Sequence, residues 1–386
     1  MLMIAVISFL TQIDLFGAQA LLPSLVERFQ STPAAMGFAV NASTIGMGFA
    51  GLAVAFASSH INRRVGIIVS LVALAIPTAL AGVTTDLTTF TWLRIIQGVF
   101  MSIAFTLTMA YLAENCSKTQ ASEAMAGYIT GAVASNLMGR IISAQLADQF
   151  GVPFSFFGFA ALNILGAILV AGYLRDGINM PSSSGNENPF RIWAVHLKNH
   201  KMTAAFAIGF VLLFAFIGIF TYVNFVLVAS PISLSPGALG LVYLVFIPAL
   251  FTTPTAGSMA LRYGLRKLYW VAISVSVVGL VLVGFPSLNA MLIGLAMIGV
   301  GIFCAQAVVT TFVGQAATAD RASASGLYLA AYYFGGVAGS FVLGIVFTSG
   351  GWIPTLGVVG LSLAIAAALG YYLTLNETET VSENGN

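Results

Sequence analysis

Residues 204–228 read AAFAIGFVLLFAFIGIFTYVNFVLV, a run of 25 residues without a single charged side chain. About 20 apolar residues in an α-helix cross the hydrocarbon core of a bilayer, which is about 30 Å thick. Water does not reach that core, so the N–H and C=O groups of a spanning segment must bond within the protein. A run of this length therefore predicts a transmembrane α-helix.

The same pattern recurs along the whole chain. Of its 386 residues, 59% are hydrophobic and 7% are charged, whereas a soluble domain carries about 25% charged residues. A surface that faces water cannot be built from this composition. We predict an all-α, multi-pass membrane protein with twelve transmembrane helices. The expected spans are 3–22, 36–57, 66–84, 90–112, 124–147, 154–174, 204–228, 237–259, 268–285, 290–313, 325–347 and 353–374.

The basic residues predict how these spans are oriented, because Lys and Arg are retained in short cytoplasmic loops. With the N-terminus in the cytoplasm, eleven of the fourteen basic residues fall on the cytoplasmic side and only Arg28 falls outside, while Arg94 and Arg140 lie within spans. The eleven are Arg63, Arg64, Lys118, Arg175, Arg191, Lys198, Lys201, Arg262, Arg266, Lys267 and Arg321. Both termini are therefore expected in the cytoplasm.

Few side chains suggest a metal or redox site. The two cysteines, Cys116 and Cys304, give no disulfide framework. The three histidines, His60, His196 and His200, fall in a loop and beside a linker, where we expect them to be solvated. The sequence predicts no metal, no cofactor and no nucleic-acid binding.

A polar stretch divides the spans into two sets of six. We expect an N-terminal six-helix bundle, a cytoplasmic linker, a C-terminal six-helix bundle and a disordered cytoplasmic tail, at residues 1–174, 175–203, 204–375 and 376–386. The halves match at an offset of 200 residues, at the pairs Tyr128 and Tyr328, Gly139 and Gly339, and Gly151 and Gly351. Two related bundles are typical of transporters that rock about a site between their halves.

Short motifs occur in the expected helices. The fourth span contains Arg94-Ile-Ile-Gln97-Gly98, the fifth contains Gly131-x-x-x-Ser135-x-x-x-Gly139-Arg140, and the loop at 59–64 reads SHINRR. The seventh and eleventh spans carry FTYVNF at 220–225 and SGLY at 325–328. Together and in this order, these motifs resemble the major facilitator superfamily. More narrowly, they resemble its bacterial drug:proton antiporters and arabinose-efflux-like exporters.

The resemblance implies a gating loop at the cytoplasmic side. The family loop after the second helix has the form Gly-x-x-x-Asp-Arg-x-Gly-Arg-Lys/Arg and is thought to latch that side by charge pairing. Here the Asp position holds Ser59, and Arg63 and Arg64 match. A similar loop follows the eighth helix, with Arg262 and Arg266 in the corresponding place. We expect these four arginines to act in gating.

Three ionisable side chains lie within spans, where a charge at mid-bilayer costs about 2.5 to 3.5 kcal/mol. Asp14 is the one carboxylate placed clearly inside a span. We expect Asp14 to carry a proton and Arg94 to tune it, a role that the family motif also implies; the alternative is a static pair that holds the bundle together. Arg140 is expected to grip an anionic group of the solute with two parallel bonds, or else to lie at the interface and snorkel.

Other polar and aromatic side chains within spans are candidates for the wall of a solute cavity. Each has an equally good structural explanation, because amide and hydroxyl groups also bridge helices. The candidates are Gln12, Asn136, Gln145, Tyr222, Asn224, Gln306, Tyr332 and Tyr333.

These observations predict a monomeric secondary transporter of the bacterial inner membrane. Export of a small organic solute in exchange for protons, by alternating access, is the favoured mode, with its direction implied by the resemblance alone. Two intramembrane arginines against one carboxylate favour an anionic or zwitterionic solute. A proton-coupled importer of an organic anion is one alternative, and a non-transporting scaffold or sensor on the same fold is another. An enzyme is not expected, because no nucleophile with its base and no phosphate loop occurs.

Overall fold

The computed structural model describes residues 2–57, 62–115, 118–174, 189–317 and 321–373. All regular secondary structure in these ranges is helical. The first half contains α1 Leu2–Gly17, η1 Ala18–Leu21, α2 Leu22–Phe29, α3 Pro33–Asn41, α4 Ser43–Ala57, α5 Arg63–Val83, α6 Leu87–Asn115, α7 Lys118–Phe150 and α8 Val152–Tyr173. The second half contains α9 Pro189–Lys198, α10 His200–Val228, α11 Pro236–Val242, η3 Tyr243–Phe246, α12 Ile247–Tyr263, α13 Leu265–Val283, α14 Leu288–Ala316, α15 Arg321–Gly350, α16 Trp352–Leu369 and η4 Gly370–Tyr372.

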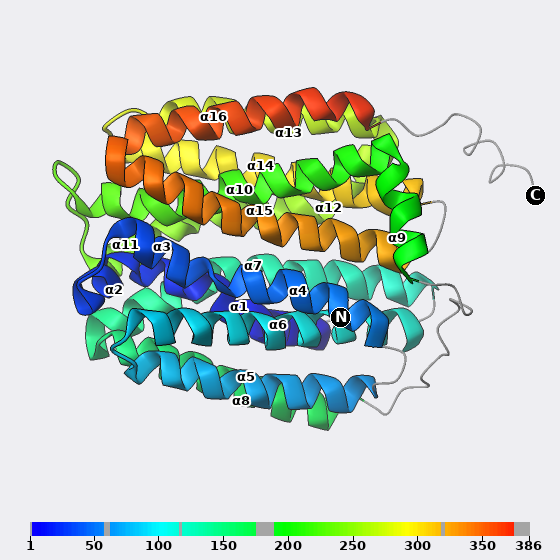
Figure 1. Ribbon diagram of the computed structural model, residues 1–386, viewed down its shortest axis with the longest axis horizontal. Coiled ribbons are helices and arrows are strands. Elements are labelled where there is room, and N and C mark those ends of the chain that lie inside the picture. The colour runs from blue at the N-terminus through cyan, green and yellow to red at the C-terminus, as the bar shows by residue number, and fades with distance from the viewer. Residues whose placement is uncertain (1, 58–61, 116–117, 175–188, 318–320, 374–386) are drawn as a thin grey trace, which may run out of the picture.

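Eleven of the expected spans coincide with helices of the described chain that are long and apolar enough to cross a membrane. The remaining expected span, 124–147, lies within α7, which is 33 residues long but is not among those eleven. Its second half carries the polar side chains of Asn136, Arg140 and Gln145. Figure 1 shows α7 lying side by side with the apolar helices and parallel to them.

The helices of the two halves pack in the same way. Helix α7 lies along α1, and α15 lies along α10. These contacts are close at the paired glycines: a Cβ at Gly139 would come within 2.7 Å of the carbonyl oxygen of Ile13, and one at Gly339 would meet the carbonyl oxygen of Phe214. Only a residue without a side chain lets the two backbones approach so closely.

The turns that follow α7 and α15 also match. Gly151 has φ 92° and Gly351 has φ 79°, a left-handed region that glycine enters without strain. The offset of 200 residues seen in the sequence therefore corresponds to a repeated turn between equivalent helices.

Equivalent helix starts repeat as well. Helices α3 and α11 each begin with Pro after a hydroxyl residue, and the Thr32 and Ser235 side chains accept hydrogen bonds from the N–H groups of Ala35 and Ala238. Proline at the first helical position and a hydroxyl cap are the residues that favour a helix N-terminus.

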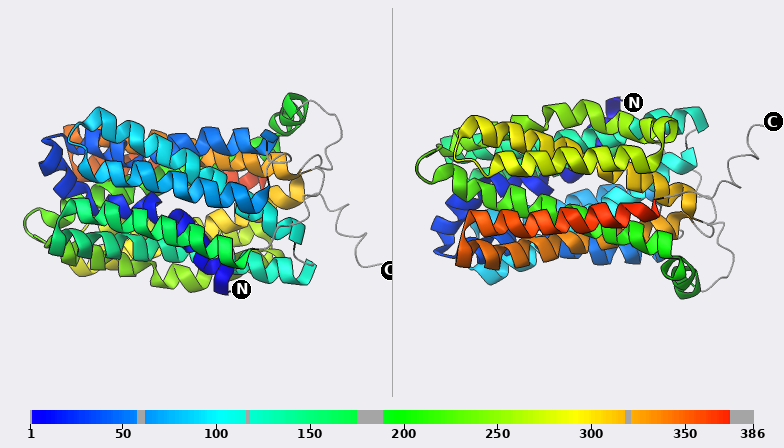
Figure 2. Two further views of the ribbon diagram at one scale, coloured as in Figure 1. Left: turned by 90° about the horizontal axis from the view of Figure 1, so that it is seen from below. Right: turned by 90° about the horizontal axis from the view of Figure 1, so that it is seen from above.

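The two halves meet through α3 and α4, which contact α15, and through α7, which contacts α11 and α12. Both contact pairs involve expected spans whose α-helix is interrupted: α3 and α4 are separate helices on either side of Ala42, and η3 separates α11 from α12. Figures 1 and 2 place α2, α3 and α11 at one end of the molecule and α9 at the other. Helix α9 contacts α10 and α15, and it buries His196, so the expectation that this histidine is solvated is wrong.

Candidate functional site

Asp14 is buried inside the first half, with 2% of its surface exposed. Its Oδ2 atom accepts hydrogen bonds from Thr78 Oγ1 of α5 at 3.0 Å and from Asn163 Nδ2 of α8 at 2.8 Å. Its Oδ1 atom is also buried and has no hydrogen-bond partner among the described residues. One carboxylate oxygen is thus held by two donors and the other is left open.

Arg94 is fully buried beside Asp14 but does not bond to its carboxylate. Its Nη1 and Nη2 atoms donate to the backbone carbonyl oxygens of Asp14 and Leu15, at 3.2 and 3.1 Å, and its Nε atom donates to that of Val40 at 2.9 Å. These carbonyls lie in the last turns of α1 and α3, where a helix leaves carbonyl groups without a partner. Gln97 Oε1 accepts a further bond at 2.6 Å. Asp14 and Arg94 are therefore neighbours that do not form the expected ion pair. Arg94 instead holds the ends of α1 and α3 together.

Arg140 lies where the two halves meet, in a cluster that we call the Arg140 cage. Its Cζ atom lies 4.4 to 5.8 Å from the centroids of five aromatic rings. The rings are those of Phe16 from the first half and of Phe216, Phe220, Tyr243 and Phe246 from the second. At this distance a ring face attracts a cation. The side chain is 0% exposed, which excludes the alternative that it snorkels to the interface.

The polar partners of Arg140 are neutral. Its Nη1 atom donates to Asn136 Oδ1 and its Nη2 atom to Gln19 Oε1, whereas its buried Nε–H has no partner among the described residues. No Asp or Glu with a described side chain bonds to it, since the one buried carboxylate, Asp14, is bonded to α5 and α8 instead. The cage therefore holds a buried cation without a counter-anion from any side chain that the structure describes.

A chain of hydrogen bonds continues from the cage across the halves. Gln19 Nε2 donates to Asn41 Oδ1 at 2.6 Å, and Asn41 Nδ2 donates to Thr221 Oγ1 of α10 at 3.0 Å. On the other side of the cage, Tyr243 Oη donates to Asn224 Oδ1 at 2.7 Å. The interface between the halves is thus polar at its centre and fully buried.

The halves are tightly sealed at the end that carries α3 and α11. Gln145 Nε2 donates to the carbonyl oxygen of Gly237 at 3.2 Å. A Cβ at Gly37 would lie 2.6 Å from the Tyr222 hydroxyl, and Gly344 faces the same hydroxyl. Tyr222 and Gln145 were expected in the cavity wall; the structure places both in this seal.

The remaining expected cavity residues are dispersed. Tyr332 Oη donates to Gln306 Oε1 at 3.0 Å, and the Tyr333 ring lies 5.6 Å from that of Tyr332, so these three form a group within the second half. Gln12 is buried on α1 with its Nε2 atom unpartnered among the described residues. Of the predicted set, the structure brings together Asn136, Arg140 and, through Tyr243, Asn224.

The expected gating arginines contact their own halves. Arg64 Nη2 donates to the carbonyl oxygen of Ala171 in α8, and Arg63 is buried. Arg262 lies over the Tyr263 ring at 5.4 Å, and Arg266 lies over the Tyr371 ring at 4.5 Å. Ser59 and His60 of the first loop lie outside the described residues.

Sequence reasoning missed the neutral partners of these charges. Thr78, Asn163, Gln19 and Tyr243 all lie within apolar spans, as do the residues that were selected. A polar side chain inside a span is the only sequence feature that could have identified these four residues. This feature is weak evidence, because many such residues only bridge helices.

Comparison with known proteins places these features in context. The family model described as Major Facilitator Superfamily matches residues 4–240 and 225–386. The chain is 26% identical over 366 residues to the "Uncharacterized MFS-type transporter YybF" of Bacillus subtilis (strain 168), covering 93% of this chain and 89% of that protein. It is 26% identical over 357 residues to the "Inner membrane transport protein YnfM" of Escherichia coli (strain K12), covering 92% and 86%.

Two solved structures have a similar fold. A point mutant of the nucleoside transporter NupG superposes with a TM-score of 0.73 at 17% sequence identity, covering 96% of this chain and 98% of that one. A bacterial homolog of the human lysosomal transporter Spinster, in an inward-facing and occupied conformation, superposes with a TM-score of 0.75 at 13% identity, covering 96% and 95%. At such identities the likeness concerns the fold alone.

Proposed function

The chain belongs to the Major Facilitator Superfamily, and we propose that within it this protein exports a small organic anion or zwitterion in exchange for protons. In this proposal α7 also crosses the membrane, as the fifth span in chain order, which brings the total to twelve. Residues 1–174 and 204–375 then form two six-helix units that rock about the site between them. The bias of Lys and Arg supports cytoplasmic termini. The name of the Escherichia coli relative supports a bacterial inner-membrane location.

The observation that carries the proposal is the uncompensated charge of Arg140. Burying a cation without an anion destabilises the protein. Such a residue is therefore expected where it binds an anion during the transport cycle. A carboxylate or phosphate of the solute would supply that partner, because a guanidinium binds either with two parallel bonds. The unpartnered Nε–H of Arg140 and its adjacent Nη groups can donate these two parallel bonds.

The aromatic rings around Arg140 suggest what the rest of the solute is like. Phe16 comes from one half and Phe216, Phe220 and Phe246 come from the other, so a solute inserted between them would touch both halves. Rings present apolar faces, which favours a planar or apolar body next to the anionic group. Because the cage is closed in this state, loading requires the halves to part, as alternating access demands.

Asp14 is the proposed proton carrier, and its geometry supplies a route to the cage. Loss of a proton would leave a carboxylate whose Oδ1 atom attracts Arg94, which now bonds to the carbonyl oxygens of Asp14 and Leu15. Movement of Arg94 would release the end of α1. The next turn of the same span carries Phe16 and Gln19, which contact Arg140. Proton loss and solute binding are thus linked through one helix end.

The sealed end of the molecule bears on the direction of transport, and separate experiments distinguish the alternatives. The seal at the α3 and α11 end supports loading from the opposite, cytoplasmic side, where the charge bias places α9. A proton-coupled importer would use the same residues, and counterflow from vesicles loaded on one side separates the two directions. A scaffold or sensor would carry no solute across the membrane, and Asp14→Asn would leave its phenotype intact.

The experiment begins with a thermal-shift screen of the purified protein. Aromatic carboxylates, sugar acids and amino acids are the probes, and a ligand at about 100 times its Kd stabilises by about 2.7 kcal/mol. A stabilising anion is then tested with Arg140→Gln and Arg140→Lys. We expect Gln to abolish the shift and Lys, which keeps the charge but not the fork, to retain part of it.

The matched control is Arg191→Gln, since Arg191 is exposed on α9; its thermal shift should equal that of the wild type. The same variants in proteoliposomes should lose solute flux in the same order. An unchanged thermal shift and flux in Arg140→Gln would refute the proposed site. Arg140→Lys keeps the test informative if the Gln variant does not fold.

A further inference from the structure

A groove of about 1190 Å³ runs along α13 on the outside of the second half. Its walls come from α12, α13 and α14 and from Leu373, and it shares no residue with the Arg140 cage. Trp270 and Val271 of this wall are about half exposed, at 48% and 53%. The groove therefore opens toward the surroundings of the protein, which for a helix of this apolarity are lipid.

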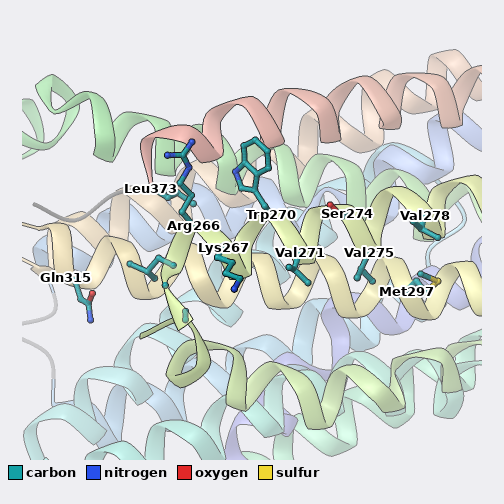
Figure 3. A pocket seen from close by; sticks show the side chains of 13 residues that line it. Arg266, Lys267, Trp270, Val271, Ser274, Val275, Val278, Met297, Gln315 and Leu373 are labelled. Carbon is teal, nitrogen blue, oxygen red and sulfur yellow. The ribbon is translucent and has the colours of Figure 1, made fainter. Parts of the chain in front are cut away.

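The chemistry of the groove changes from one end to the other. Arg266 and Lys267 lie at the end that begins α13, and Trp270 follows one turn later (Figure 3). Beyond them the wall is mostly apolar, with Val271, Val275 and Val278 beside a single hydroxyl residue, Ser274, and Met297 of α14. Arg266 is held in place by ring contacts, 5.9 Å from the centroid of Trp270 and 4.5 Å from that of Tyr371.

The length of the groove matches one leaflet of a bilayer. The wall from Leu265 to Val278 covers 13 helical steps, which at about 1.5 Å per residue is roughly 20 Å. One leaflet, including its headgroup region, is about 20 to 22 Å deep. A Trp between a basic end and an apolar end is the order found where a helix crosses the headgroup boundary.

We propose that this groove binds one anionic phospholipid. Lys267 contacts the headgroup phosphate, and Arg266, which points to the other side of α13 (Figure 3), adds positive charge at the same end of the groove. Trp270 lies at the level of the glycerol, and an acyl chain lies against the valines. None of the described residues that line the groove is acidic, so its charge favours an anion. Arg266, which the sequence assigned to gating, contacts rings of its own half in the structure, and lipid binding gives it a role there. The site is independent of the proposed solute.

The test uses the fluorescence of Trp270, one of four tryptophans in the chain. A variant with Trp92→Phe, Trp193→Phe and Trp352→Phe leaves Trp270 as the reporter. It is reconstituted in vesicles of phosphatidylcholine that contain equal fractions of either brominated phosphatidylglycerol or brominated phosphatidylcholine. Each basic residue near a membrane surface contributes about 1 kcal/mol toward an anionic lipid, which corresponds to about fivefold. We expect quenching to show a 5- to 30-fold preference for phosphatidylglycerol at low salt.

Two further variants assign that preference to the groove. Arg266→Gln with Lys267→Gln should reduce the preference to near one, whereas Arg262→Gln, which removes one positive charge next to the groove but not in its wall, should retain it. Counting the phosphatidylglycerol molecules that stay bound in native mass spectrometry repeats the test in the protein with all four tryptophans. Equal quenching by both lipids would overturn the proposal. An equal loss in Arg262→Gln would also overturn it, by showing a diffuse surface effect.

Discussion

The substitution Asp14→Asn should uncouple solute movement from protons while leaving the fold intact. Asp14 is the one buried carboxylate among the described side chains. An amide oxygen in place of Oδ2 accepts the same hydrogen bonds from Thr78 and Asn163, now 3.0 and 2.8 Å long. The amide nitrogen takes the place of Oδ1, which is buried without a partner among the described residues, so we expect the free energy of unfolding to fall by about 1 to 3 kcal/mol. The amide cannot take up or release a proton in the physiological range, so it mimics one state of the cycle permanently.

The size of the effect follows from the number of proton sites. One carboxylate carries one proton per cycle, and one pH unit is worth about 1.36 kcal/mol per proton, which is a tenfold concentration ratio. With the membrane potential held at zero by potassium and valinomycin, the wild type should concentrate its solute about tenfold per unit of imposed pH gradient. In Asp14→Asn the ratio should stay near one, while exchange of labelled for unlabelled solute across the vesicle membrane continues.

The assay measures radiolabelled solute in proteoliposomes, with the anion found in the thermal-shift screen. Glu27→Gln is the matched control, because Glu27 is an exposed acid on α2, and it should concentrate solute like the wild type. A tenfold ratio per pH unit in Asp14→Asn would refute the role of Asp14. A hundredfold ratio in the wild type would require a second proton and contradict the count of one.

Three smaller predictions concern packing, the cage and a helix cap. Gly139→Val should lower the free energy of unfolding by about 1 to 3 kcal/mol, because its Cβ meets a carbonyl oxygen of α1 at 2.7 Å; Gly357→Ala, which meets nothing within 4 Å, is the control in a thermal melt. Tyr243→Phe keeps the ring of the cage but leaves the Asn224 amide oxygen without its donor, so solute flux should fall and stability should drop by about 1 to 3 kcal/mol. Hydrogen bonds from the first turn of α6, led by a backbone N–H, hold the pKa of Asp86 below its usual range. The stabilisation by Asp86 is thus present above about pH 4 and lost as the pH falls through the lower folded pKa, so the difference in Tm between wild type and Asp86→Ala should shrink in acid.

The spans were predictable because an apolar run of fixed length has one stable form in lipid. Ionisable residues inside those runs were equally visible, and Asp14, Arg94 and Arg140 are all buried in the structure. The paired glycines were visible as a repeat, and they correspond to repeated close contacts and turns. These features depend on short stretches of sequence, which is why sequence alone reveals them.

The partners of the charges were not predictable, for two physical reasons. Asp14 and Asn163 are 149 residues apart, and only the packing of α1 against α8 joins them. Arg94 binds backbone carbonyls, and every residue has a carbonyl, so its partners carry no signature. The five-ring cage is hidden for a related reason, because phenylalanine is an ordinary residue in any lipid-facing helix.

The interrupted spans have a mechanical consequence. At each interruption a tighter turn replaces regular α-helical hydrogen bonds, and a helix bends more easily at such a point than within a regular stretch. The pieces before the interruptions, α3 and α11, are 9 and 7 residues long. Arg94 donates to the Val40 carbonyl oxygen near the end of α3, so its side chain is placed to stiffen that bend.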